Sequence, residues 1–293
     1  MNMTGKPEKK RSWLFYALVT MVTWGVWSAF SDQPDYPATL TYVVWAISMI
    51  PCALVALANI HFKLDVRKKS MWLSLAVGLL GAGGQLALFQ ALRYGPAYLV
   101  IPMISVAPIV TVILSVIFLK ERVGRLGYLG IALAFVAIVC FSLSGKTDES
   151  IKSSLWLVFS AVVFIFWGIQ GLVMKLANNS TPDPESVFVY MAISGVVLIP
   201  AALALTDWSQ PVNHGWNGPW MTFCVQILNA IGAYTLVYAN RYGKAMIVAP
   251  LANACAPVIG CVISLVLYSH VPSPVQVTGI AAAIACVLIF SKE

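Results

Sequence analysis

Ten apolar segments follow one another along this chain of 293 residues, and they constrain its fold more than any other feature. They are approximately residues 13–31, 38–60, 71–92, 96–119, 125–143, 154–175, 186–206, 218–240, 245–268 and 273–290. The hydrocarbon core of a bilayer is about 30 Å thick, and a helix needs roughly 20 apolar residues to cross it. A backbone inside lipid must satisfy its own hydrogen bonds, which favours helices. The chain is therefore predicted to be an all-α polytopic membrane protein with ten transmembrane helices.

The composition supports a membrane protein and argues against an enzyme. Hydrophobic residues make up 60% of the chain and charged residues 10%, whereas a soluble domain is about 45–50% apolar and about 25% charged. The connections are too short for a soluble catalytic domain, and the sequence has no H-E-x-x-H, G-x-S-x-G or Walker motif. The six cysteines lie in apolar runs without a C-x-x-C pair, so we expect neither a metal site nor a cofactor.

The positive charges indicate an orientation rather than a nucleic-acid partner. The net charge of +7 is spread over short loops, with 15 Lys and Arg residues on the side of the N-terminus and 3 on the other side. Cytoplasmic loops carry such an excess. The N-terminal basic stretch precedes an apolar run rich in Trp and Tyr, which we interpret as an uncleaved first span. We expect a multi-pass protein of the cytoplasmic membrane with both termini in the cytoplasm, in contact with lipid and open to forming a homo-oligomer.

One sequence pattern occurs twice, in ALRYGPAYLVIPMISVAPIV from Ala91 and in ANRYGKAMIVAPLANACAPVI from Ala239. The first copy follows the third span and the second copy follows the eighth, so an odd number of spans separates them. WGVW from Trp24 and WGIQ from Trp167 follow the same shift. We therefore predict two inverted five-helix repeats, residues 13–143 and 154–290. Inverted repeats are typical of transporters that expose a midplane site to each side in turn.

These features resemble the EamA-like families of the drug/metabolite transporter superfamily. The resemblance rests on the ten spans, the repeat core that begins at Ala91, and the Leu-Lys-Glu-Arg that ends at Arg122. The second half departs from the pattern, because Tyr268-Ser269-His270 stands at the corresponding place. The resemblance implies transport of small metabolites such as amino acids or sugars. It also implies a cavity lined mainly by spans 1, 3, 4, 6, 8 and 9, with spans 5 and 10 at the periphery.

Polar side chains inside the spans are the candidates for a solute site, because polar groups in a bilayer are costly. None of the acidic residues lies in the middle of a span, so a buried carboxylate for proton relay or for a cationic drug has no candidate. The expected solute is neutral, zwitterionic or anionic, moved by a facilitator or exchanger. Aromatic faces with amide groups at their rims suit a sugar or an amino-acid side chain. The candidate cavity residues are Trp24, Trp27, Gln85, Gln90, Ser105, Trp167, Gln170, Asn229, Tyr234, Tyr238 and Asn253.

Two further sets of residues are candidates for movement. Arg93-Tyr94 and Arg241-Tyr242 end corresponding spans and are predicted gates at opposite faces, with Glu121 and Asp207 as conceivable partners; snorkelling to lipid headgroups is the alternative. Prolines inside spans remove a helical hydrogen bond and can kink the helix. The kink candidates are Pro102, Pro108, Pro250 and Pro257.

The sequence thus favours a secondary transporter of small organic metabolites that works by alternating access. We expect export of amino acids or related metabolites. Uptake of a sugar or another neutral solute is the alternative, suggested by the Trp and amide content. A receptor or scaffold without transport is a remote third possibility, disfavoured by the inverted duplication.

Overall fold

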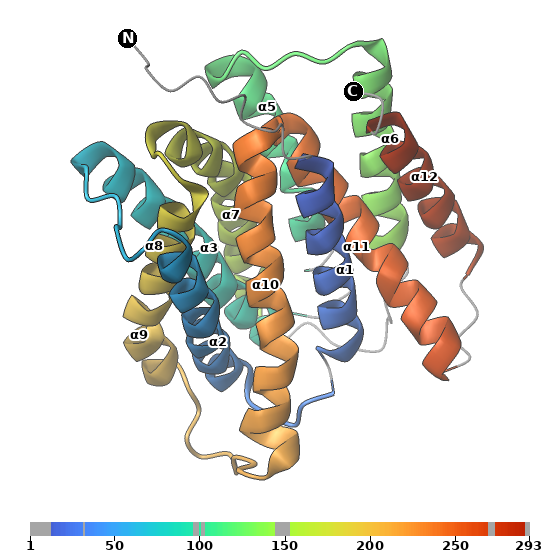
Figure 1. Cartoon of the computed structure of the whole chain (residues 1–293). Helices are drawn as coiled ribbons and strands as arrows, with labels where there is room; N and C mark the ends of the chain where they lie inside the picture. The colour runs from blue at the N-terminus through green and yellow to red at the C-terminus, as the bar shows by residue number, and fades with distance from the viewer. Residues whose placement is uncertain are drawn as a thin grey trace.

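The computed structural model describes residues 13–31, 33–95, 100, 103–143, 153–268 and 273–290, and within them the chain forms helices and no strand (Figure 1). A helix occurs in each of the ten predicted segments. The elements are α1 (Trp13–Phe30), α2 (Ala38–Asn59), α3 (Lys68–Tyr94), α5 (Pro108–Phe118), α6 (Arg125–Ser142), α7 (Leu155–Ser180), α8 (Pro184–Val197), α9 (Ile199–Ala204), the π-type turn η1 (Trp216–Trp220), α10 (Met221–Tyr242), α11 (Ala245–Tyr268) and α12 (Pro274–Phe290).

Six stretches of the described chain combine the length and hydropathy needed to cross a membrane. They are α1, α2, α3, α7, the α8–α9 pair and η1 with α10. Shorter apolar helices lie at Met103–Phe118, Arg125–Phe141, Ala245–Gly260 and Pro274–Phe290. The chain is therefore a multi-pass helical membrane protein, and the count of ten spans stays a prediction.

Prolines explain why two predicted spans are interrupted. Pro108 has no N–H and starts α5 directly after a turn at residues 106–107. The backbone hydrogen bonds around it join residues three positions apart, from Ala107 N to Ile104 O (3.0 Å) and from Ile109 N to Val106 O (2.9 Å). Pro200 likewise begins α9, where α8 breaks at Leu198. In contrast, Pro250 and Pro257 lie inside the continuous helix α11, and Pro102 is outside the described residues.

The helix contacts come in corresponding pairs from the two halves. α1 packs against α10 and α11, while α7 packs against α3 and α5. α3 packs against α8, and α10 packs against α2. α2 also packs against α8, and α6 packs against α12, which stands with it at one edge of the bundle (Figure 1). Exchanging each helix for its counterpart in the other half thus maps these contacts onto one another.

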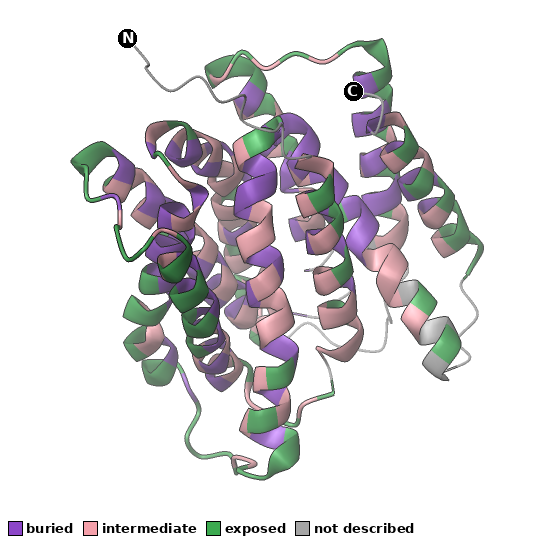
Figure 2. Ribbon diagram, viewed as in Figure 1, coloured by how far each residue is buried: buried purple, intermediate pink, exposed green. Residues whose placement is uncertain are grey.

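Apolar packing holds the bundle together while its outer surface stays apolar. One buried cluster joins α1, α6, α10, α11 and α12, and another joins α2, α3, α7, α8 and α10. Large hydrophobic side chains such as Leu54, Val136 and Val277 are exposed on the outside of the bundle (Figure 2). Lipid tails are as apolar as these side chains, so no second protein layer is needed to cover them.

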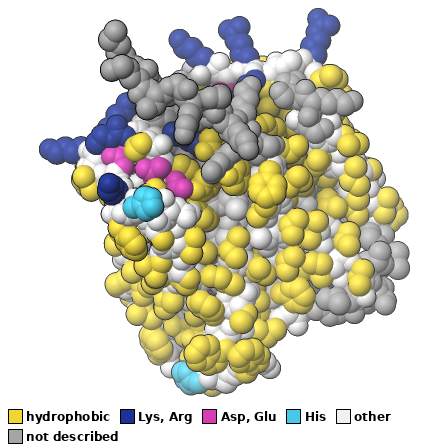
Figure 3. Space-filling model, in the orientation of Figure 1, with side chains coloured by type: hydrophobic (Ala, Val, Ile, Leu, Met, Phe, Trp, Pro, Cys, Tyr) yellow, Lys and Arg dark blue, Asp and Glu magenta, His cyan; other side chains and the backbone are white. Residues whose placement is uncertain are grey.

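The charged side chains gather at one end of the bundle, which we call the basic face (Figure 3). Of the Lys and Arg residues that the structure describes, ten lie there: Lys63, Arg67, Lys68, Lys69, Lys120, Arg122, Arg125, Lys175, Arg241 and Lys244. Arg93 belongs to the opposite face, where its charge acts on Asp207. Exposed Trp72 lies near the basic face, and Trp208, Trp216 and Trp220 lie toward the opposite one. Trp side chains at both ends are typical of the two membrane–water interfaces.

Candidate functional site

A cavity of about 240 Å³ lies between the two halves of the chain. Its walls come from α1, α2, α3, residues 104–111, α7, α8, α10 and α11; α6 and α12 contribute no described lining residue. Among the residues that the structure describes, the lining contains no Asp, Glu, Lys, Arg or His. Its polar members are Trp24, Trp27, Trp45, Gln85, Thr111, Trp167, Gln170, Asn229, Asn240 and Asn253.

Four indole rings are fixed in the cavity wall by hydrogen bonds from their N–H groups. Trp24 Nε1 donates to Asn229 O (3.3 Å), and Trp167 Nε1 donates to Gly81 O (3.4 Å). Trp45 Nε1 donates to Asn229 Oδ1 (2.8 Å). Trp27 Nε1 donates to Gln226 Oε1 (3.1 Å), just beyond the lining. These bonds leave the ring faces and edges, rather than the N–H groups, available to a solute.

Two glycines let the corresponding Trp rings approach the facing helices closely. A Cβ added at Gly232 would lie 2.3 Å from Trp24 Cδ1, and one added at Gly84 would lie 2.3 Å from Trp167 Nε1. Such distances are far inside van der Waals contact, so a larger residue would displace the ring. The same Trp-over-Gly contact therefore occurs twice, each time with the Trp from one half and the Gly from the other.

Three of the five cavity amides are anchored through their NH₂ groups. Gln170 Nε2 donates to Val77 O (3.1 Å), and Asn253 Nδ2 donates to Ala249 O (2.9 Å). Asn240 Nδ2 donates to Leu236 O (3.1 Å), and its Oδ1 is buried without a hydrogen-bond partner among the described residues. Gln85 lies half-buried in the wall.

The structure brings most of the predicted cavity residues together. Trp24, Trp27, Gln85, Trp167, Gln170, Asn229, Asn253 and Pro108 all line the cavity. Gln90 is buried on α3, and Ser105 lies in the short helical stretch before Pro108; neither is in the lining. Their part in solute binding stays a prediction.

Tyr234 and Tyr238 lie on α10 outside the cavity lining. The hydroxyl of Tyr238 donates to Glu185 of α8 and lies 3.3 Å from the hydroxyl of Tyr234, which accepts from Asn59 Nδ2 at 3.3 Å. The ring of Tyr16 stacks on Tyr238 with centroids 4.8 Å apart. The two phenols therefore join α10 to its neighbours, and neither lines the cavity.

The wall also includes residues that the sequence did not single out. Trp45 and Met49 come from α2 and Met191 comes from α8, although the family resemblance implied spans 1, 3, 4, 6, 8 and 9. Asn240 was missed as well. Trp45 lies within its apolar segment as Trp24 does, and that signal could have identified it.

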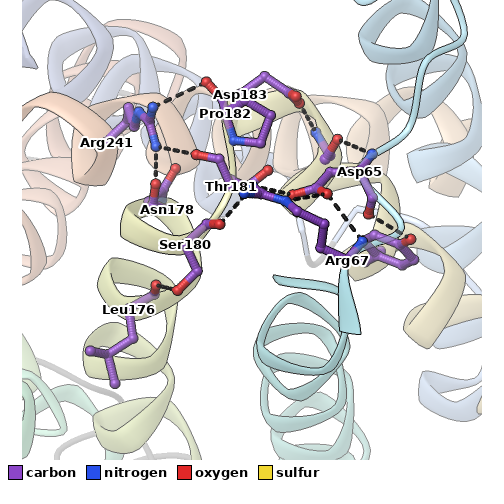
Figure 4. Close-up of polar contacts among 11 residues, drawn as sticks. Asp65, Arg67, Leu176, Asn178, Ser180, Thr181, Pro182, Asp183 and Arg241 are labelled. Carbon is purple, nitrogen blue, oxygen red and sulfur yellow. Dashed lines mark hydrogen bonds and ion pairs between the residues drawn. The ribbon is translucent and has the colours of Figure 1, made fainter. Parts of the chain in front are cut away.

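Arg241 binds backbone carbonyls at the corner between α7 and α8 (Figure 4). Its guanidinium donates to Asn178 O, to Thr181 O (2.9 Å) and to Pro182 O (3.1 Å). These oxygens end α7 or follow it, and helix C-termini attract cations. Glu121, one of the two conceivable carboxylate partners, accepts from Ala245 N (3.1 Å) and Met246 N (3.0 Å) at the start of α11.

A second arginine fastens the same corner. Arg67 donates to Ser180 O (2.8 Å) and forms an ion pair with Asp65 at 2.8 Å (Figure 4). Asp65 is held in turn by α8, because its N–H donates to Ser186 Oγ (3.1 Å) and its carbonyl accepts from Tyr190 (3.0 Å). Hydrogen bonds from Arg67 hold the pKa of the Asp65 carboxyl well below its usual range. The α2–α3 loop is thereby tied to the α7–α8 corner.

Arg93 has a looser setting than Arg241. Its guanidinium is exposed and lies 5.9 Å from the ring centroid of its neighbour Tyr94, which stacks on Phe159. It makes no hydrogen bond with the described residues. The pKa of Asp207 is lowered mainly by hydrogen bonding to Ser209 and to a smaller extent by the charge of Arg93. Tyr242, the partner of Arg241 in the motif, stacks near Tyr16 at 6.1 Å.

A bundle of apolar spans around a central uncharged cavity defines a polytopic membrane protein with an internal polar site. The described residues contain no group of three or more His, Cys, Asp or Glu that could hold a metal ion. The chain belongs to the EamA-like transporter family, whose sequence profile matches residues 11–143 and 154–292. The family resemblance drawn from the sequence is thus confirmed.

Curated relatives name different solutes. The chain is 28% identical over 292 residues to a "Probable terminal-alkyne amino-acid exporter" of Streptantibioticus cattleyicolor, covering 97% of this chain and 95% of that protein. It is 24% identical over 260 residues to a "Riboflavin transporter" of Vibrio cholerae, covering 88% and 84%. It is 36% identical over 70 residues to a "Probable magnesium transporter" of Candida albicans, but this match covers 24% of the chain and 19% of that protein.

A solved structure described as "Crystal structure of protein" has the same fold. It matches with a TM-score of 0.73 over 96% of each chain. Sequence identity is 16%, so the likeness concerns the fold alone.

Proposed function

We propose that this protein is a secondary transporter that moves small organic metabolites by alternating access, with export of amino acids or related metabolites as its activity. The observation that carries the proposal is the uncharged cavity enclosed by both halves of the chain. Four indole rings and five amide side chains can bind an apolar body and a polar head together. The relative that matches over 97% of the chain is named as an amino-acid exporter, which favours this solute class.

The proposed mechanism uses residues 13–143 and 154–290 as two inverted five-helix repeats within ten spans. The paired helix contacts and the repeated Trp-over-Gly arrangement support it. Two such halves can pack in two nearly equivalent ways, each open to one side. Both termini and the basic face would lie in the cytoplasm, because the described positive charges concentrate there.

An asymmetry between the halves supports a particular state. α7 and α10 are in contact toward the basic face, whereas their counterparts α1 and α3 make no contact of similar extent among the described residues. Arg241 is bound to the α7–α8 corner, while its counterpart Arg93 is exposed. The protein is thus in a state closed at the basic face, in which Arg241 acts as the closed gate and Arg93 as the released one.

Uptake of a neutral solute is the second candidate. The similarity to a riboflavin transporter favours it, and a flat polar molecule also suits a cavity lined with Trp. Magnesium fits the lining less well, because Mg²⁺ is bound through carboxylates and water, and none of the described lining residues carries a carboxylate.

Two-sided labelling tests alternating access. A single cysteine replaces Gln85 in a cysteine-free background, and an impermeant maleimide is added to either side of sealed vesicles. We expect labelling from both sides, with a transported solute slowing both reactions. A cysteine at Trp208, which is exposed at the opposite face, should react from one side only. Labelling of the Gln85 position from a single side under all conditions would argue against transport and for a receptor or scaffold.

A further inference from the structure

The cations beside the cavity are already occupied by backbone carbonyls. Lys175 follows the lining residue Met174, and its Nζ donates to the carbonyls of Asn240 (2.7 Å), Arg241 (3.4 Å) and Gly243. An ammonium group has three N–H donors, so these bonds use all of them. Arg241 directs three of its five N–H donors to carbonyls of the α7–α8 corner and does not line the cavity. No cation among the described lining residues therefore meets an anionic solute in this state.

The hydrogen-bonding capacity that remains in the wall consists mainly of neutral amide groups. A backbone carbonyl can only accept, so the NH₂ groups of Gln170, Asn253 and Asn240 must face their carbonyl partners. The oxygens of these three side chains have no hydrogen-bond partner among the described residues. A primary amide has two N–H donors, so each of these three NH₂ groups keeps one besides its carbonyl contact. The wall therefore offers a solute neutral amide donors and acceptors, and no cation among the described lining residues.

The indole rings favour a solute that carries hydrogen-bond donors. Because each indole N–H is bound by the protein, the rings present their π surfaces to a solute. An aromatic face carries negative charge and attracts cations and N–H or O–H groups. A carboxylate facing these rings and oxygens would lose its water without gaining a cationic partner among the described lining residues, which is costly.

We infer that the cavity takes solutes that carry hydrogen-bond donors and no net negative charge, such as amines, amino acids or polyols with an apolar body, and that it rejects organic anions. The inference rests on the proposed function, since it names the solute class of the same cavity. It narrows the range expected from the sequence, which included anions.

Four probes that share a phenyl group test the inference with the purified full-length protein. Phenylalaninamide carries an amine, phenylalanine is a zwitterion, phenyl β-glucoside is a polyol and phenyllactate is an anion. Binding is measured as the concentration dependence of the thermal unfolding temperature. We expect phenylalaninamide, phenylalanine or the glucoside to bind at least about tenfold more tightly than phenyllactate, the ratio that one lost charged hydrogen bond produces. Tighter binding of phenylalaninamide and phenylalanine would identify ammonium groups as the preferred donors, whereas tighter binding of the glucoside would identify hydroxyl groups.

A charge-changing variant locates this preference in the cavity. Asn253→Asp replaces an exposed amide in the wall with a carboxylate and should raise the affinity ratio of the preferred donor probe to phenyllactate when that probe is an amine. For the glucoside, the expected rise comes from weaker phenyllactate binding. The matched control is Gln276→Glu on α12, where the acid can still accept from Ser273 N. If Asn253→Asp unfolds without ligand, Asn253→Leu should lower the ratio instead.

The outcomes separate the inference from the proposed function. Tightest binding by phenyllactate, no binding by any probe, or an unchanged ratio in the folded Asn253 variants would overturn the inference. Counterflow of the same probes in proteoliposomes reports on transport separately. Exchange of phenyllactate would contradict the inference and keep the transporter, whereas binding of donor probes without exchange would keep the inference and contradict transport.

Discussion

Removal of the Arg241 guanidinium should open the basic face. The side chain donates to three carbonyls of the α7–α8 corner, and the bond to Pro182 is exposed to water. Hydrogen bonds from charged groups contribute about 1.5–3 kcal/mol each. Counting the two less exposed bonds at the lower value gives about 3 kcal/mol. That amount shifts the equilibrium toward the state open at the basic face by roughly a hundredfold.

Cysteine accessibility measures this shift. Met174 lines the cavity and is 2% exposed, so a cysteine there, in a cysteine-free background, should react slowly with an impermeant maleimide added at the basic face. Arg241→Ala should increase the rate by up to the same hundredfold. Arg241→Lys should give an intermediate rate, because an ammonium lacks the planar fork of a guanidinium.

Arg93→Ala is the matched control, since Arg93 ends the corresponding helix in the first half and makes no hydrogen bond with the described residues. Because Arg93 is the gate expected to close in the other state, its loss should not raise the labelling rate at the Met174 position above that of the parent protein. An unchanged rate in Arg241→Ala, in a protein that unfolds at the normal temperature, would refute the gate.

Three further predictions concern stability and solute binding. Asp65→Asn should lower the free energy of unfolding by about 1–3 kcal/mol at neutral pH, whereas Asp207→Asn at the exposed opposite face should change it little. The folded-state pKa of Asp65 is depressed, so its stabilising contribution is present above the ordinary carboxyl pKa of about 3.9 and is lost as the pH falls through the folded value. The unfolding temperatures of Asp65→Asn and the parent protein should therefore converge in acid. Gly232→Ala should displace Trp24 and cost about 1–3 kcal/mol, while Gly195→Ala, whose added Cβ would lie 3.5 Å from its nearest neighbour, should unfold at the parent temperature; equal unfolding temperatures would show that the close approach of Trp24 is unimportant. Trp45→Phe removes the N–H bonded to Asn229 Oδ1 and should weaken solute binding about tenfold if that bond positions the amide, whereas an unchanged dissociation constant would exclude this role.

The positions of the helices could be predicted because hydropathy and proline act locally. The apolar segments located every helix in the part of the chain that the structure describes, and the missing N–H of Pro108 marks the turn in the fourth segment. Trp24 and Trp167 were identified from a repeat that sequence comparison within one chain can detect. Their glycine partners could not be paired with them, because Gly84 and Gly232 stand out only when the facing helix is known.

The direction of side chains around an apolar helix was harder to predict. In a soluble helix the polar stripe marks the outer face, but in a membrane helix both the lipid face and the packed face are apolar. Trp45 was therefore missed, and Tyr234 and Tyr238 were assigned to the cavity although their hydroxyls lie in the cluster with Glu185. Glu121 and Asp207 were conceivable partners for the two gate arginines, whereas the partners of Arg241 are backbone carbonyls, which no residue letter reveals.

Counterflow in proteoliposomes is the direct test of amino-acid transport through this cavity. Vesicles are preloaded in turn with an amino-acid mixture and a sugar mixture, and uptake of the labelled solute is followed without an ion gradient. We expect saturable exchange of the amino-acid pool, lost in the Trp24→Ala, Trp167→Ala double variant and kept in Trp208→Ala, whose indole lies outside the cavity. Exchange of the sugar pool alone would select the second candidate. Absence of exchange from both pools, or full exchange by the double variant, would contradict transport of these solutes through this cavity.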